Sequence, residues 1–232
     1  MHNTGPKVGD PRQFVHRVQH GAGATISSVT PRAVLLDLLM ATMDSISTWS
    51  AAAGDRERGL VWRDAVTARM IGAGRYVDYD RLVERAAEDV GLPREAPAAL
   101  RQAWSAMQRW PDASVLEGLG VPYAFVTNCS TELAAIAVQR SGLRPAFTLS
   151  AEDAGWYKPK GKVYALAVEM LELEPIRVQF VAGAPYDAVG AANAGLSSVL
   201  VARRAVREPV PTGITVVDSL LEAVEGPKRD LG

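Results

Sequence analysis

Four short apolar runs between residues 33 and 202 most strongly constrain the fold of this chain. Their sequences are Ala33-Val-Leu-Leu, Tyr123-Ala-Phe-Val-Thr, Val178-Gln-Phe-Val-Ala and Ser198-Val-Leu-Val-Ala. A continuous apolar run of this length is typical of a strand buried on both faces of a parallel sheet. A weaker run, Thr215-Val-Val, follows them.

Helical segments lie between these runs, at residues 130–141, 161–171 and 187–194. Strands that alternate with helices favour an α/β fold with a doubly wound, mostly parallel, Rossmann-like sheet. Residues 31–45 and 111–232 are therefore predicted to form this α/β core.

Residues 46–110 have a different pattern. Their apolar residues follow helical spacing at 61–71, 79–90 and 96–108, with no convincing strand. We expect an all-helical cap domain inserted after the first strand. Residues 1–30 contain no comparable pattern, and we expect a mostly disordered N-terminal extension.

Composition excludes several classes of protein. With a net charge of −1, a pI near 6.3 and no basic face, the chain does not resemble a nucleic-acid-binding protein. The first 30 residues contain no apolar stretch long enough for a membrane span or signal peptide. Cys129 is the single cysteine, which fits a reducing cytoplasm. We expect a cytoplasmic protein.

Histidine is missing from most of the chain. His2, His16 and His20 all lie in the first twenty residues, so a Ser/His/Asp triad is not expected. Proton abstraction in the core must then fall to a carboxylate, a lysine or a tyrosine. Asp37 and Asp187 are the natural candidates, because each follows an apolar run where a parallel strand would end at a ligand cleft.

Four segments in this order resemble the motifs of the haloacid dehalogenase superfamily, and within it the L-2-haloacid dehalogenase subgroup. The resemblance covers about residues 32–224 and rests on Asp37-Leu-Leu-Met-Ala-Thr-Met-Asp, Val126-Thr-Asn-Cys-Ser, Trp156-Tyr-Lys-Pro with Val163-Tyr, and Gly183-Ala-Pro-Tyr-Asp. It implies a hydrolase that removes halide from a small 2-halo carboxylic acid, and a homodimer.

The resemblance also implies roles for individual residues. Asp37 would be the nucleophile, Lys158 would stabilise negative charge, and Asp187 would activate water. Val61-Trp62-Arg63 resembles the Trp-Arg pair of the subgroup, whose arginine receives the halide. The expected substrate-binding residues are Thr127 and Asn128 for the carboxylate, Leu38, Leu39 and Tyr186 for apolar walls, and Tyr164 for a catalytic contact.

Leu39 decides between two chemistries. Phosphatases of this superfamily have an aspartate at this position to protonate the leaving group, whereas a departing halide needs no proton. The fourth motif also supplies one acid where magnesium-dependent relatives present two, and Mg²⁺ needs several oxygen ligands. We therefore expect no metal and no cofactor, and a phosphatase or phosphonatase is disfavoured.

Three alanines depart from the subgroup pattern and leave an alternative open. Ala41 stands where threonine is usual, with Thr42 one position late, and Ala182 and Ala184 replace serine and asparagine. The alternative is an impaired or repurposed protein that binds a small acidic metabolite or a protein partner. Structural readings also remain for the site residues: a loop cap for Asp37, a solvated turn for Lys158, a helix N-cap for Asp187, an exposed ion pair for Arg63 and core packing for Tyr164.

Overall fold

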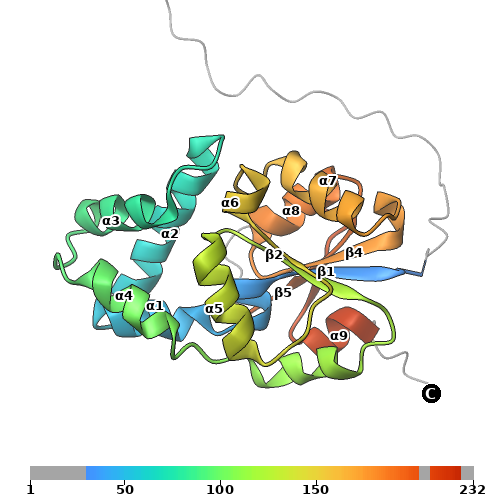
Figure 1. Cartoon of the computed structure of the whole chain (residues 1–232), viewed down its shortest axis with the longest axis horizontal. Helices are drawn as coiled ribbons and strands as arrows, with labels where there is room; N and C mark the ends of the chain where they lie inside the picture. Colours follow the sequence, from blue (N-terminus) through green and yellow to red (C-terminus); the bar gives the residue numbers. More distant parts are fainter. Residues whose placement is uncertain (1–29, 204–209, 226–232) are drawn as a thin grey trace, which may run out of the picture.

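A computed structural model of the protein describes residues 30–203 and 210–225 (Figure 1). The extension predicted for residues 1–30 lies outside the described residues except for residue 30. Six parallel strands form one sheet in the order β3-β2-β1-β4-β5-β6, which confirms the predicted α/β class. The strands are β1 Ala33–Asp37, β2 Tyr123–Thr127, β3 Thr148–Ser150, β4 Val178–Ala182, β5 Ser197–Val201 and β6 Thr215–Val217.

Helices cover both faces of this sheet. In Figure 1, α7 and α8 lie above the sheet, and α5 and α9 lie below it. The helices of the α/β part are α5 Thr131–Ser141, α6 Ala151–Ala154, α7 Gly161–Met170, α8 Pro185–Asn193 and α9 Leu220–Glu225, with short 3₁₀ turns η2 Pro111–Gly118 and η3 Pro175–Arg177.

Alternate residues of the central strands pack into two separate hydrophobic cores, one on each face of the sheet. Leu35 and Phe180 pack with α7 and α8, whereas Leu36 and Phe125 pack with α5 and α9. All four side chains are 0% exposed. Burial on both faces explains why these strands are continuous apolar runs rather than alternating ones.

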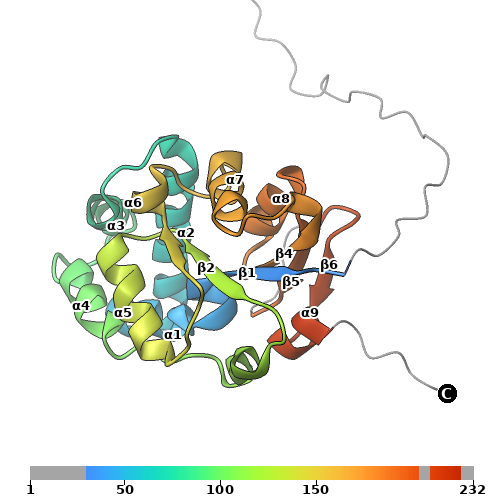
Figure 2. The same cartoon turned by 45° about the vertical axis from the view of Figure 1, so that its right-hand side comes forward.

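Residues 45–104 form four helices, and none of these residues lies in a strand. Figure 2 shows these helices beyond the ends of β1 and β2. Whether they form a separate domain over 46–110 stays a prediction. They are α1 Ser45–Ala53, α2 Arg56–Ala73, α3 Tyr79–Asp89 and α4 Ala96–Trp104.

Buried tryptophans connect the helices to their neighbours. The Trp62 indole donates a hydrogen bond to the Val83 carbonyl at 3.0 Å, and the Trp104 indole donates to the Leu133 carbonyl at 3.0 Å. Trp104 thereby links α4 to α5 of the α/β part. None of the helices in the described part of the chain combines the length and apolarity needed to cross a membrane.

Gly59 sets the distance between α1 and α2, which yields a stability prediction. A Cβ at Gly59 would lie 2.7 Å from the Ser50 backbone, whereas a Cβ at Gly72 of the same helix meets nothing within 4 Å. Helix propensity favours alanine over glycine by about 1 kcal/mol, but such overpacking costs about 1–3 kcal/mol. We expect Gly59→Ala to lower the urea midpoint and the control, Gly72→Ala, to raise it. A higher midpoint for Gly59→Ala would contradict the close packing.

Candidate active site

The candidate site lies where three neighbouring parallel strands end. Asp37 is the last residue of β1, Thr127 the last of β2 and Ala182 the last of β4. β1 pairs with β2 on one side and with β4 on the other. Because side chains at adjacent carboxyl ends converge on the same crevice, residues far apart in sequence meet here.

Lys158 is the centre of this site. Its ammonium donates three hydrogen bonds: to Asp37 Oδ1 at 2.9 Å, to Asp187 Oδ2 at 2.6 Å and to the Val126 carbonyl at 2.9 Å. The Lys158 side chain is 1% exposed. The reading of Lys158 as a solvated turn residue is therefore wrong.

Asn128 fixes the main chain of Lys158. The Lys158 amide donates to Asn128 Oδ1 at 2.8 Å, and Asn128 Nδ2 donates to the Lys158 carbonyl at 3.1 Å. This two-way pairing holds the lysine against the end of β2. Since one amide hydrogen of Asn128 is still available, its predicted contact with a substrate is compatible with this arrangement.

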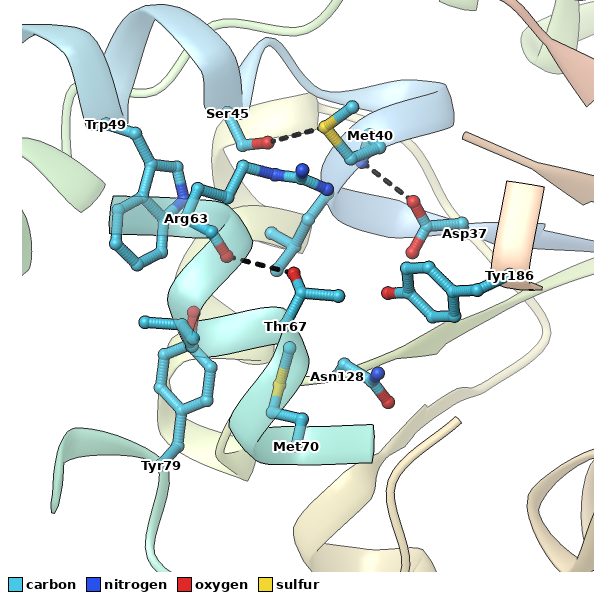
Figure 3. Close-up of a pocket in the computed structure, with 12 residues that line it drawn as sticks. Asp37, Met40, Ser45, Trp49, Arg63, Thr67, Met70, Tyr79, Asn128 and Tyr186 are labelled. Carbon is cyan, nitrogen blue, oxygen red and sulfur yellow. Dashed lines mark hydrogen bonds between the residues drawn. The ribbon is translucent and has the colours of Figure 1, made fainter. Parts of the chain in front are cut away.

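A tight turn after β1 holds the second carboxylate oxygen of Asp37. Leu38–Thr42 form one π-helical turn, in which the Met43 amide donates to the Leu38 carbonyl at 2.9 Å. Asp37 Oδ2 accepts a hydrogen bond from the Met40 amide at 2.9 Å (Figure 3). It accepts a second one from the Ala41 amide at 3.3 Å. Main-chain donors thus hold this carboxylate.

Thr42, one position after Ala41, contacts the main chain of the turn. Its hydroxyl donates to the main-chain carbonyl of Asp37 at 3.1 Å, not to the carboxylate. The threonine therefore stabilises the turn, and the turn amides hold the acid. Asp44, the second acid of the first motif, caps α1 by accepting from the Ser47 amide at 3.0 Å.

Asp187 lies in the first turn of α8 and is 1% exposed. The N-cap of that helix is Ala184, so the reading of Asp187 as the N-cap is wrong. Tyr164 donates its hydroxyl to Asp187 Oδ1 at 2.5 Å, while Lys158 occupies Oδ2. Tyr164 therefore acts on the site through Asp187.

Burial and charge shift the pKa values in this cluster. Burial raises the pKa of Asp187 to about 6, against the opposing effect of Lys158. Burial alone would lower the pKa of Lys158, but Asp187 and Asp37 outweigh it and raise that pKa above its ordinary value. Lys158 is thus an ammonium at neutral pH, and Asp187 changes its charge within the physiological range.

Arg63 enters the site from α2. It is 7% exposed, so the reading of Arg63 as a solvent-facing residue is wrong, although its guanidinium does pair with Asp64 at 3.2 Å. Val66, Thr67 and Met70 follow it on the same face of α2, at helical spacings of three, four and seven residues. This face forms one wall of a pocket.

The pocket is small and lies between this wall and Asp37 (Figure 3). Its volume is about 40 Å³. Among residues 30–203 and 210–225, no group of three or more His, Cys, Asp or Glu side chains is placed to hold a metal ion. The pocket is lined by Asp37, Leu39, Met40, Ser45, Trp49, Arg63, Val66, Thr67, Met70, Tyr79, Asn128 and Tyr186.

The structure brings five of the ten predicted residues to this pocket and three more to the network beside it. Asp37, Leu39, Arg63, Asn128 and Tyr186 line it. Lys158, Asp187 and Tyr164 form the buried network behind Asp37. The remaining two predicted residues are not pocket-lining: Leu38 is buried in the hydrophobic core, and the Thr127 hydroxyl lies 3.6 Å from the Cys129 sulfur.

Sequence reasoning missed most of the α2 wall and its neighbours. The available signal was the period of α2, since Val66, Thr67 and Met70 share the face of Arg63. Cys129 is buried beside this site, and burial raises the pKa of its thiol to about 12, so the thiol is protonated at neutral pH. The other unpredicted lining residues are Met40, Ser45, Trp49 and Tyr79.

Comparison with known proteins adds to this geometry. No protein-family model matches the chain. It is 28% identical to (S)-2-haloacid dehalogenase 1 of Pseudomonas sp. (strain CBS-3) over 142 residues, which are 56% of this chain and 63% of that protein. It is 31% identical to (S)-2-haloacid dehalogenase of Xanthobacter autotrophicus over 140 residues, 56% of this chain and 55% of that protein. The matches thus span less than two thirds of these relatives.

A solved structure extends the likeness to nearly the whole fold. L-2-haloacid dehalogenase from Xanthobacter autotrophicus, with chloropropionic acid covalently bound, superimposes with a TM-score of 0.72 at 23% identity. The match covers 84% of this chain and 98% of that one. The chain is therefore similar in sequence to L-2-haloacid dehalogenases over about half of its length, and it has their fold. These comparisons confirm the resemblance to L-2-haloacid dehalogenases that the sequence motifs indicate.

The buried network predicts a pH-dependent loss of stability. Lys158→Met would leave two carboxylates, 10% and 2% exposed, without their shared cation. We expect the free energy of unfolding at pH 7 to fall by about 3–5 kcal/mol. Without the ammonium, the folded-state pKa of Asp187 rises further above its unfolded value, so this loss shrinks as the pH falls and the carboxylate becomes protonated.

Urea unfolding at pH 7 and pH 5 measures this difference. Lys160→Met is the matched control, since Lys160 is exposed two residues away. An equal loss at both pH values for Lys158→Met would show that the ammonium is not needed to balance ionised carboxylates.

Proposed function

We propose that this protein is a metal-independent hydrolase of the 2-haloacid dehalogenase type. One observation carries the proposal: a buried ammonium joins Asp37 to Asp187, at 2.9 and 2.6 Å, beside a pocket that contains the Arg63 guanidinium. A carboxylate held ionised by a lysine suits nucleophilic attack, and a second cation suits the leaving anion.

The first step is a displacement at the carbon that bears the halogen. A carboxylate oxygen of Asp37 forms a bond to C2 of the substrate, and the halide leaves with the electron pair of the carbon–halogen bond. Arg63 receives the halide. The product is an aspartyl ester, and the negative charge of Asp37 has passed to the halide.

The second step is hydrolysis of this ester. Asp187 takes a proton from water, and the resulting hydroxide attacks the aspartyl carbonyl carbon. The bond between that carbon and the oxygen bound to the substrate then breaks, and the proton passes to the departing alkoxide. The 2-hydroxy acid leaves, and Asp37 keeps one oxygen of the water. The second proton of the water passes from Asp37 to solvent, which restores the carboxylate.

The residues that line the pocket suit a small carboxylic acid as substrate. Leu39 and Met40 supply apolar surface beside Asp37, which favours displacement by excluding water. Burial raises the pKa of Tyr186 to about 12, so its hydroxyl stays protonated at neutral pH and is available as a hydrogen-bond donor. The Asn128 amide and Tyr186 hydroxyl are the proposed partners of the substrate carboxylate.

The relatives support the same chemistry. The two curated ones are (S)-2-haloacid dehalogenases, and the solved structure carries a covalently bound chloropropionic acid. Homodimer formation and a cytoplasmic location stay predictions for this chain.

A binding function is the second candidate, and the alanines after β4 favour it. Ala182 and Ala184 are 0% and 7% exposed and offer no side-chain hydrogen bond to a hydrolytic water. Loss of one preorganised donor typically slows catalysis by about 100- to 1000-fold. Thermal stabilisation by a short carboxylic acid, without halide release from any 2-halo acid, would favour the binding function.

Isotope transfer to Asp37 tests the displacement mechanism. We expect Asp37→Asn to abolish chloride release from 2-chloropropionate because the nucleophile is lost. The control is Asp44→Asn, which keeps a good N-cap on α1 and lies outside the pocket. After a single turnover in H₂¹⁸O, we expect the peptide that contains Asp37 to carry ¹⁸O, which mass spectrometry measures. Label only in the product acid would reject the ester.

Protonation of Asp187 determines how kcat is expected to depend on pH. As the pH falls through about 6, Asp187 takes up a proton and can no longer act as a base. Hydrolysis takes place after Asp37 has lost its charge, which removes one cause of the raised pKa of Asp187. We therefore expect kcat for 2-chloropropionate to fall about tenfold per pH unit below a midpoint at or below about 6. The alkaline side stays flat because the pKa of Lys158 is raised above its ordinary 10.5. An acidic midpoint well above about 6, or no fall in kcat on the acid side, would contradict this assignment.

A further inference from the structure

The main-chain turn that holds Asp37 is itself held by residues that the proposed mechanism does not use. The Trp110 indole donates a hydrogen bond to the Met40 carbonyl at 3.1 Å, and the Trp110 main-chain amide donates one to the Thr42 carbonyl at 2.9 Å. The Met40 carbonyl belongs to the same peptide unit as the Ala41 amide. That amide donates to Asp37 Oδ2 at 3.3 Å.

Arg203 holds the next peptide unit of the turn. Its Nε and Nη2 donate to the Ala41 carbonyl at 3.2 and 2.7 Å. The same guanidinium binds both carboxylate oxygens of Asp112 at 2.8 Å each. The Arg203 side chain is 8% exposed, and its Cζ lies 5.0 Å from the centre of the Trp110 ring.

Asp112 completes this support. It also accepts a hydrogen bond from the Leu220 amide at 2.8 Å, so Arg203 is fixed from the start of α9. The turn is closed from the other side by Gly183, where a Cβ would lie 2.3 Å from the Met40 Cβ and 2.5 Å from the Ala41 amide nitrogen. The Met40–Ala41 peptide therefore has little room to rotate.

We infer that Trp110 and Arg203 are positioning residues for an oxyanion hole formed by the Met40 and Ala41 amides. This inference rests on the proposed function. It assigns Asp37 Oδ2 as the carbonyl oxygen of the aspartyl ester. Negative charge returns to this oxygen when hydroxide adds to the ester carbon, and the two amides are already aimed at it.

Polarisation adds to the geometric effect. A hydrogen bond accepted by a peptide carbonyl strengthens the hydrogen bond that the amide of the same peptide donates. The Trp110 indole acts in this way on the Ala41 amide. Arg203 acts through position: its charge-assisted bonds hold the Ala41 carbonyl, whose peptide carries the Thr42 amide and neither amide of the oxyanion hole. Both effects favour hydrolysis of the ester more than its formation, because the ester oxygen gains charge only in hydrolysis.

Trp110→Phe is the decisive variant, since it removes the indole N–H and keeps a ring beneath Arg203. The matched control is Trp104→Phe, which removes an indole bond of similar length to the Leu133 carbonyl, away from the turn. Arg203→Lys keeps a cation but loses the fork that binds Ala41 and Asp112 together. Rapid-quench mass spectrometry with 2-chloropropionate follows the ester, and chloride release gives the turnover rate.

We expect Trp110→Phe and Arg203→Lys to slow ester hydrolysis by about tenfold. Ester formation should change much less, so the ester accumulates in the steady state. Trp104→Phe should leave the ratio of the two rates unchanged even if it lowers stability. Equal slowing of both steps, or no ester accumulation in either variant while the wild-type protein turns over, would overturn the inference. A wild-type protein that forms no ester and releases no halide would overturn the proposed function and this inference with it.

Discussion

The interaction of one buried ammonium with two carboxylates determines the architecture of the site. Lys158 uses all three of its hydrogens, on Asp37, Asp187 and the Val126 carbonyl. These acceptors lie in different directions around one nitrogen. A guanidinium has the same charge, but its donors lie in one plane on a larger group. An arginine at position 158 would therefore keep the positive charge, but it would lose the arrangement of hydrogen bonds that allows both carboxylates to be buried.

The sequence was sufficient to predict the sheet and the acids because both depend on short-range patterns. Continuous apolar runs marked β2 and β4 with the bounds that the structure has, since burial on both faces leaves little freedom in composition. Asp37 is the last residue of β1, Lys158 lies in the loop between α6 and α7, and Asp187 lies in the first turn of α8. Their meeting follows from parallel pairing of β1 with both neighbours.

Other features depended on geometry that no local pattern encodes. β3 has only three residues, at an edge of the sheet, and its sequence does not differ from a loop. Leu38 was predicted to face the substrate, but the π-helical turn after Asp37 directs it into the core. Trp110 and Arg203 meet that turn across 70 and 162 residues of sequence, and nothing near either residue indicates its partner.

The central position of β1 has a consequence for how the chain folds during synthesis. β1 pairs with residues 123–126 on one side and 178–181 on the other, so it leaves the ribosome well before either neighbour exists. Its pairings are among the most non-local in the molecule, and such contacts form slowly. The cation that pairs with Asp37 is Lys158, which is synthesised 121 residues later. Assembly of the sheet centre and neutralisation of its buried acids are thus late, coupled events.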